Sequence, residues 1–95
     1  MTDQDKQIIA DYMGWKPGMD DWWRSGDYRS VKVNFDLNDA GLCVKEMQRR
    51  GDWKYDFMDF VAGSQKWNYY QCVAWLYDAD NFFTVFVAWL KKGKK

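Results

Sequence analysis

Aromatic side chains constrain this chain more than any other feature of its sequence. Its 95 residues include seven Trp, six Tyr and six Phe. A domain of this size has few fully enclosed positions, so this many large rings cannot all lie in its core. We therefore expect some of them at the surface. Exposed aromatic patches usually mark a contact surface, because Trp and Tyr bury much area at a small cost in rotamer entropy.

The overall composition narrows the class of protein. Basic and acidic residues number 14 each, so no strong net field attracts nucleic acid or an anionic membrane. The longest apolar run, residues 82–90, is interrupted by Thr84 and is far too short to span a bilayer. Residues 1–5 lack the basic and apolar regions of a signal peptide. We expect a single globular domain over residues 1–95 that stays in the cytoplasm and has no membrane contact.

The sequence contains no recognisable catalytic or metal-binding motif. It has no His, which removes the usual proton shuttle, the Ser-His-Asp triad and His-bearing zinc sites. Its two cysteines, Cys43 and Cys72, have apolar neighbours, so we expect buried thiols rather than a disulfide. Asp clusters such as residues 78–81 lack the Gly and distal Glu of a calcium loop and suit helix capping better. We therefore predict no enzyme activity, no metal and no cofactor.

Two segments carry both the periodicity and the end signals of helices. In residues 3–13 and in residues 38–50, the apolar side chains recur three and four positions apart. The ends are marked by Thr2 and Gly14 in the first segment, and by Asp36 or Asn38 with Gly51 in the second. These two segments are predicted to be helices.

A third helix is predicted near the C-terminus. Residues 82–87 alone would suit a strand, because they are mostly aromatic or β-branched. The flanking residues favour a helix instead. Asp78 or Asp80 can act as the N-cap, and two lysines follow at the other end, where they suit the negative end of a helix dipole. We predict a helix over residues 79–91.

Three further segments are predicted to be extended. Residues 31–37 alternate strictly between apolar and polar side chains, as a short strand does. Residues 53–61 begin with alternating aromatics, and residues 67–77 are rich in aromatic and β-branched side chains, so these two segments should form an antiparallel hairpin. Residues 16–30 are rich in Gly, Asp and Trp and indicate a loop. The predicted fold class is α+β, with a single layered domain of three helices packed on a small antiparallel sheet.

Several short tracts resemble a known family. They are residues 9–15 (Ile-Ala-Asp-Tyr-Met-Gly-Trp), the tract 28–47 through Asp36-Leu37-Asn38, and the helix end at residues 46–51. With the closing strands and helix, they resemble the phage ABA sandwich domain of small phage and prophage proteins. The resemblance covers most of the chain. It implies a layered sheet with helices on both faces and a phage origin, but no agreed activity and no catalytic residues. The chain departs from the family near its end, where the large rings suggest an added contact: Phe82, Phe83, Phe86 and Trp89.

The leading candidate for a binding site is the cluster Trp22-Trp23-Arg24 in the predicted loop. Trp and Arg are enriched at interface hot spots, although one of the two indoles is expected to fold back onto the core. Acidic neighbours would favour a basic partner, and they are Asp20, Asp21 and Asp27. We predict a phage- or prophage-encoded protein that binds a host or phage protein and inhibits a host defence or nucleic-acid enzyme.

Nucleic acid is the alternative partner. The basic tail could contact phosphates while exposed aromatics of the predicted sheet stack on bases, although zero net charge weakens such binding. The residues concerned are Lys91, Lys92, Lys94 and Lys95 with Arg49 and Arg50, and the aromatics Tyr55, Trp67 and Tyr69. A homodimer also stays open, because the aromatic surplus would serve a two-fold contact equally well.

Overall fold

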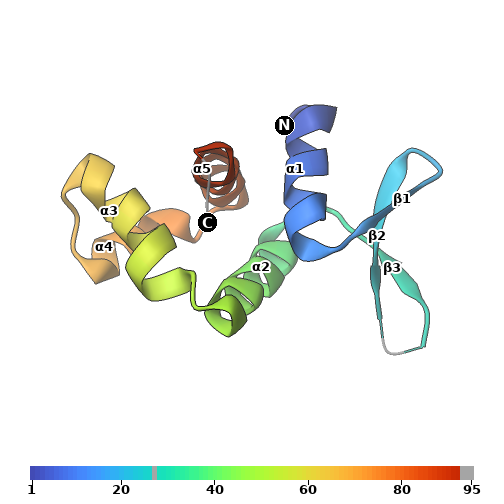
Figure 1. Ribbon diagram of the computed structural model, residues 1–95, viewed down its shortest axis with the longest axis horizontal. Coiled ribbons are helices and arrows are strands. Elements are labelled where there is room, and N and C mark those ends of the chain that lie inside the picture. The colour runs from blue at the N-terminus through green and yellow to red at the C-terminus, as the bar shows by residue number, and fades with distance from the viewer. Residues whose placement is uncertain (27, 93–95) are drawn as a thin grey trace.

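The computed structural model describes residues 1–26 and 28–92, with residues 64 and 65 described by their backbone alone. Within these residues the chain forms five α-helices, one π-helical turn (η1) and a three-stranded antiparallel sheet in the order β1-β2-β3 (Figure 1). The elements are α1 (Asp3–Met13), β1 (Lys16–Gly18), β2 (Asp21–Ser25), β3 (Ser30–Lys32), α2 (Leu37–Arg50), η1 (Trp53–Phe57), α3 (Met58–Gln65), α4 (Tyr69–Leu76) and α5 (Ala79–Lys91).

The helices and the sheet occupy different parts of the molecule. Figure 1 shows the sheet at one end, projecting away from the helices, with α1 and α2 nearest to it. α5 packs against α1, α2 and α4, so it is the central helix of the core. The layered arrangement of three helices on a sheet is therefore wrong, although the α+β class is right.

The three predicted helices are all present. α1 begins after Thr2, whose side chain accepts a hydrogen bond from the backbone N of Asp5, and it ends at Gly14 in the left-handed conformation. Asp36 caps α2, which starts one residue earlier than predicted, and Asp78 caps α5. These ends were predictable because each cap satisfies backbone groups that the helix itself leaves without partners.

The predicted hairpin of residues 53–61 and 67–77 is wrong, because both segments are helical. The alternation of aromatics at 53–57 also fits a helix: Trp53 and Phe57 are four residues apart and stack on each other with ring centroids 5.7 Å apart. Residues 69–76 begin with a capping box in which the side chains of Asn68 and Gln71 bond each other's backbone N–H groups. Cys72 therefore lies on a helix rather than on a strand, although it is buried and free, as Cys43 is.

The observed sheet lies where a loop was predicted. β1 and β2 are joined by the two-residue turn Met19-Asp20, in which both residues have positive φ, at 51° and 67°. Gly, Asn or Asp usually occupies such positions, so Met19 conceals the turn from sequence inspection. The predicted strand 31–37 is shorter than expected, because Phe35 also has a positive φ of 54° and the chain then enters α2.

Aromatic rings form the centre of the core. The rings of Phe57, Phe82 and Phe86 are fully buried, and the ring of Phe57 lies 5.3 Å from that of Trp89. Burying each such side chain stabilises a fold by roughly 1.5–3 kcal/mol. The four large rings at the chain end thus supply internal packing, which corrects the expectation that they make an added contact.

Candidate functional site

Trp23 is held within its own hairpin. It lies on β2 rather than in a loop, and its indole Nε1 donates a hydrogen bond of 2.8 Å to the carbonyl of Gly18 on β1. A Cβ at Gly18 would lie 3.2 Å from Cδ1 of Trp23, so the missing side chain makes room for the ring. This indole therefore braces the hairpin.

Trp22 and Arg24, on either side of Trp23, also turn toward the molecule. Trp22 is half-buried and packs against the core, as expected for one of the two indoles. Nε of Arg24 is buried without a hydrogen-bond partner, and it lies 3.9 Å from Oδ1 of Asp39, beyond hydrogen-bonding distance. Asp39 itself accepts a hydrogen bond of 2.7 Å from the backbone N of Asn34 through its other oxygen. Arg24 thus remains a loosely paired cation.

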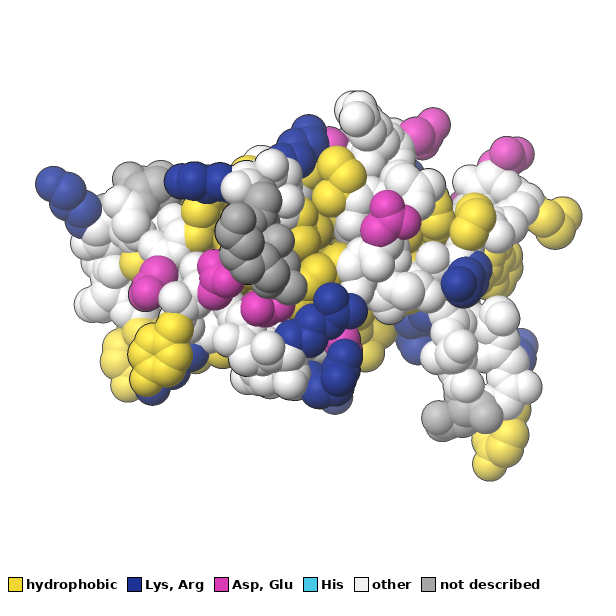
Figure 2. Space-filling view, viewed as in Figure 1, with side chains coloured by type: hydrophobic (Ala, Val, Ile, Leu, Met, Phe, Trp, Pro, Cys, Tyr) yellow, Lys and Arg dark blue, Asp and Glu magenta, His cyan; other side chains and the backbone are white. Residues whose placement is uncertain are grey.

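Two of the predicted acidic residues line a different hollow from Arg24. Asp20 and Asp21 line a hollow between the hairpin and α1, together with Trp22. Asp21 lies 3.7 Å from the ammonium of Lys32, whereas Met19 at the turn is 92% exposed. Figure 2 shows hydrophobic side chains at both outer ends of the sheet. Asp27 lies outside the described residues.

Arg24 lines a second hollow, of about 410 Å³, between the end of β2 and α2. The charged side chains there are three cations and one anion: Arg24, Lys45, Arg49 and Glu46. Hydrogen bonds from Arg49 and from Arg50 lower the pKa of Glu46 to about 2. The lining therefore carries a net positive charge, opposite in sign to the partner-facing charge expected from the sequence.

A third, strongly apolar concavity is a groove of about 310 Å³ between α2 and α4, which we call the α2–α4 groove. None of the described residues that line it carries a side chain charged at neutral pH. α2 contributes Leu37, Ala40, Gly41, Val44 and Gln48, and η1 contributes Trp53. α4 contributes Tyr69, Val73 and Leu76, followed by Tyr77 after its end and Phe82 on α5. Sequence inspection missed this groove.

α4 forms a wall of the groove and carries no charged side chain on its outer side either. Residues 67–77 contain no charged residue, in a chain of which 29% is charged. Tyr70 and Tyr77 are 81% and 79% exposed, and Val73 is 40% exposed. α4 therefore presents to the outside an uncharged face that includes the exposed Tyr70 and Gln71.

Gly41 lies in the groove within the first half of α2. A Cβ built at this position meets no atom within 4 Å, so packing within the protein does not require glycine here. Glycine in a helix interior costs about 0.5–1 kcal/mol relative to alanine. The residue leaves open space in the groove at a cost in stability.

The signal that could have revealed the groove is the capping box. Asn68 and Gln71 start a helix, and in that helix Tyr69, Val73 and Leu76 fall on one side at helical spacing. High strand propensity of the aromatic residues favoured the wrong structure. On a helix, Tyr69, Val73 and Leu76 line the groove opposite α2.

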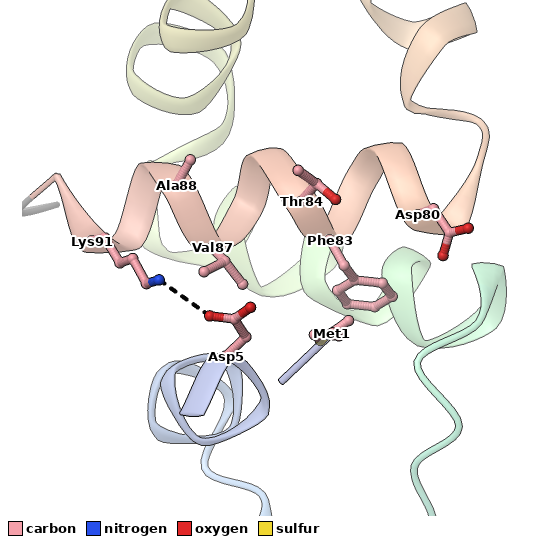
Figure 3. A pocket seen from close by; sticks show the side chains of 8 residues that line it. All are labelled: Met1, Asp5, Asp80, Phe83, Thr84, Val87, Ala88 and Lys91. Atoms are coloured by element: carbon pink, nitrogen blue, oxygen red, sulfur yellow. Dashed lines mark ion pairs between the residues drawn. The ribbon is translucent and has the colours of Figure 1, made fainter. Parts of the chain in front are cut away.

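A further cleft of about 520 Å³ lies between α1 and α5 (Figure 3). Lys91 closes one side of it through an ion pair of 3.2 Å to Asp5, whose pKa this hydrogen bond lowers. Phe83 lies beside Met1 in the same view, and Val87 lies beside Asp5. The cleft combines charged and apolar side chains, so its lining is less uniform than that of the α2–α4 groove.

The described residues contain neither a metal-binding cluster nor a membrane-spanning helix. No group of three or more Cys, Asp or Glu side chains in residues 1–26 and 28–92 could hold a metal ion. No helix in that part of the chain combines the length and hydropathy needed to cross a membrane.

Known proteins add no further constraint. The chain matches no protein-family model, no curated protein and no solved structure. The resemblance to the phage ABA sandwich domain accordingly stays a prediction.

Proposed function

We propose that this protein acts by binding another protein, and that the α2–α4 groove receives an amphipathic helix of that partner. The observation that carries the proposal is the uncharged groove, with exposed Tyr69, Val73 and Tyr77 on one wall. Apolar grooves between helices bind amphipathic helices through side chains spaced three or four residues apart. Tyrosine suits such a surface, because its ring buries area while its hydroxyl bonds water or the partner.

The shape of the groove also favours a helix over an extended peptide. Its walls are themselves helices, and the lining side chains of α4 span two helical turns from Tyr69 to Leu76. Extended peptides usually bind at a sheet edge through backbone hydrogen bonds. The space beside Gly41 would let the backbone of an incoming helix approach α2 closely.

The proposed cellular role follows from the fact that binding would cover an apolar helix face of the partner. A protein that covers an apolar helix face of a partner prevents that face from making its normal contact. In our proposal the chain is a phage-encoded protein that blocks a host or phage protein in this way. The nucleic-acid alternative combined basic residues with aromatics on strands at 53–61 and 67–77. Those segments are helical, so the stacking surface of that alternative is wrong, and two of its lysines, Lys94 and Lys95, lie outside the described residues.

The test uses a display library of amphipathic helices carried on a stable helical scaffold, with the apolar face randomised. A scaffold is needed because isolated helices shorter than about 12–15 residues are marginal in water. Selection against the wild-type protein should enrich a family of helices. Val73→Asp, which places a charge in the groove, should abolish their binding.

Ala74→Asp is the matched control, because Ala74 neighbours Val73 on α4 and is exposed but does not line the groove. Both variants should keep the helical circular dichroism spectrum of the wild type. Helices that bind Ala74→Asp and wild type alike, and not Val73→Asp, support the proposal. Equal binding to all three proteins, or no enrichment, would refute it.

A further inference from the structure

Two exposed cations of α2 lie next to groove-lining residues, on the side of the helix that faces the 410 Å³ hollow. Val44 and Gln48 line the groove, and the next residue after each is a cation, Lys45 and Arg49. Both cations are exposed, and the side chain of Arg49 is 70% exposed even while it bonds Glu46. No ion pair of Lys45 occurs among the described residues. A ligand in the groove would therefore have positive charge along one of its sides.

Arg24 extends this positive surface behind α2. Its guanidinium shares the 410 Å³ hollow with Lys45 and Arg49, and only Glu46 opposes them there. The nearest carboxylate to Arg24, that of Asp39, is 3.9 Å away and already bonds the backbone N of Asn34. The positive charge beside the groove is thus incompletely neutralised within the protein.

On the other side of the groove α4 itself carries no charge, and the exposed Asp78 follows Tyr77 just beyond its end. The exposed residues of α4 that do not line the groove are Tyr70, Gln71 and Ala74. A helix lying between α2 and α4 would meet cations along its flank over α2 and uncharged side chains along its flank over α4. Complementary charge across an interface favours the matching partner and penalises like charge.

We propose that the helix bound in the α2–α4 groove carries Asp or Glu along the flank over α2 and uncharged side chains along the flank over α4. This inference rests on the proposed function, since it describes the partner of the same groove. It gives the bound helix a defined chemistry on three sides: an apolar face in the groove, an acidic flank and an uncharged flank.

A second copy of this chain does not fit that description. The exposed face of α4 carries no charge, so a second copy that offered this face would give Lys45 no carboxylate. A helix of a different protein with an acidic flank fits the groove and its border better.

The experiment also varies the two flanks of the library helices. Each position on either flank is encoded as Glu, Gln or Lys in equal proportion. Wild-type protein should enrich Glu on one flank and Gln on the other. Replacing that Glu by Gln in a selected helix should weaken binding about two- to fivefold per position, as expected for exposed ion pairs. Added salt should reduce this difference.

Lys45→Glu should shift the enriched flank residue from Glu to Lys, whereas Lys16→Glu, on the exposed β1 strand, should leave the preference for Glu unchanged. Enriched helices that show no flank preference, or that prefer Lys on a flank, would overturn the inference. The proposed function would remain intact if Val73→Asp still abolished the binding of those helices. Absence of any enrichment that depends on Val73 would overturn both. A dimer in light scattering that Val73→Asp dissociates would also overturn both, because a second copy would then cover the groove.

Discussion

The hydroxyl of Tyr12 donates a hydrogen bond of 2.8 Å to Oδ2 of Asp52, which joins the end of α1 to the segment that follows α2. Both side chains are buried, and the guanidinium of Arg50 lies over the Tyr12 ring, 4.1 Å from its centroid. Burial, and then the hydrogen bond to Asp52, raise the pKa of Tyr12 well above its usual value. This contact fixes α2, a wall of the groove, to the core.

Tyr12→Phe is expected to lower the free energy of unfolding by about 1–2 kcal/mol, because a buried carboxylate loses a hydrogen-bond donor. Urea denaturation of the variant and the wild type measures the difference. Tyr28→Phe removes the same hydroxyl from a fully exposed residue and should have almost no effect. Equal stability of the two variants would show that the Tyr12–Asp52 hydrogen bond contributes nothing.

Acid should destabilise the protein in part through Glu46. Its pKa falls from an unfolded value of 4.5 to about 2 in the fold, because Arg49 and Arg50 bond the carboxylate. A lowered pKa means that this stabilisation is complete above about pH 4.5 and is lost as the pH falls toward 2. Glu46→Gln should flatten the decline of melting temperature across that range. An unchanged pH profile in Glu46→Gln would contradict the assignment.

Gly41→Ala should stabilise the free protein by up to about 1 kcal/mol, because alanine favours a helix interior and the structure has room for its Cβ. Gly41→Leu should in addition obstruct the groove and weaken binding of selected helices. Thermal melts and binding titrations of the two variants separate these effects. A loss of stability in Gly41→Ala would mean that glycine is needed for the fold itself and would remove one support for a docking surface.

The parts of the fold that could be predicted are those with local chemical signals. α1, α2 and α5 each combine a capping side chain with a buried stripe, so sequence and packing agree. Strands were wrongly predicted for residues 53–77 because aromatic residues have a high intrinsic strand propensity. In this fold, tertiary packing and the Asn68–Gln71 capping box stabilise helices instead. The turn at Met19 carried no glycine or asparagine to mark the first hairpin.

The candidate site was less predictable than the helices. The Trp22-Trp23-Arg24 cluster has the residue types of an interface, but hydrogen bonding and packing engage the two indoles internally. The groove requires α2 and α4 to border the same hollow, which depends on how both pack around the core. The uncharged stretch 67–77 was visible in the sequence, yet only its helical conformation gives it an outward apolar face.

Site-specific photo-crosslinking tests the central claim most directly. A benzophenone amino acid replaces Tyr69, which lines the groove, or Tyr28, which is fully exposed in the loop between β2 and β3, and extracts of the source organism supply the partner. We predict one discrete cross-linked product from position 69, mapped by mass spectrometry to a helix of the partner. It should disappear with Val73→Asp, persist with Ala74→Asp and be missing from position 28. A product from position 28 alone, or one from position 69 that survives Val73→Asp, would contradict the assignment of the groove as the binding site.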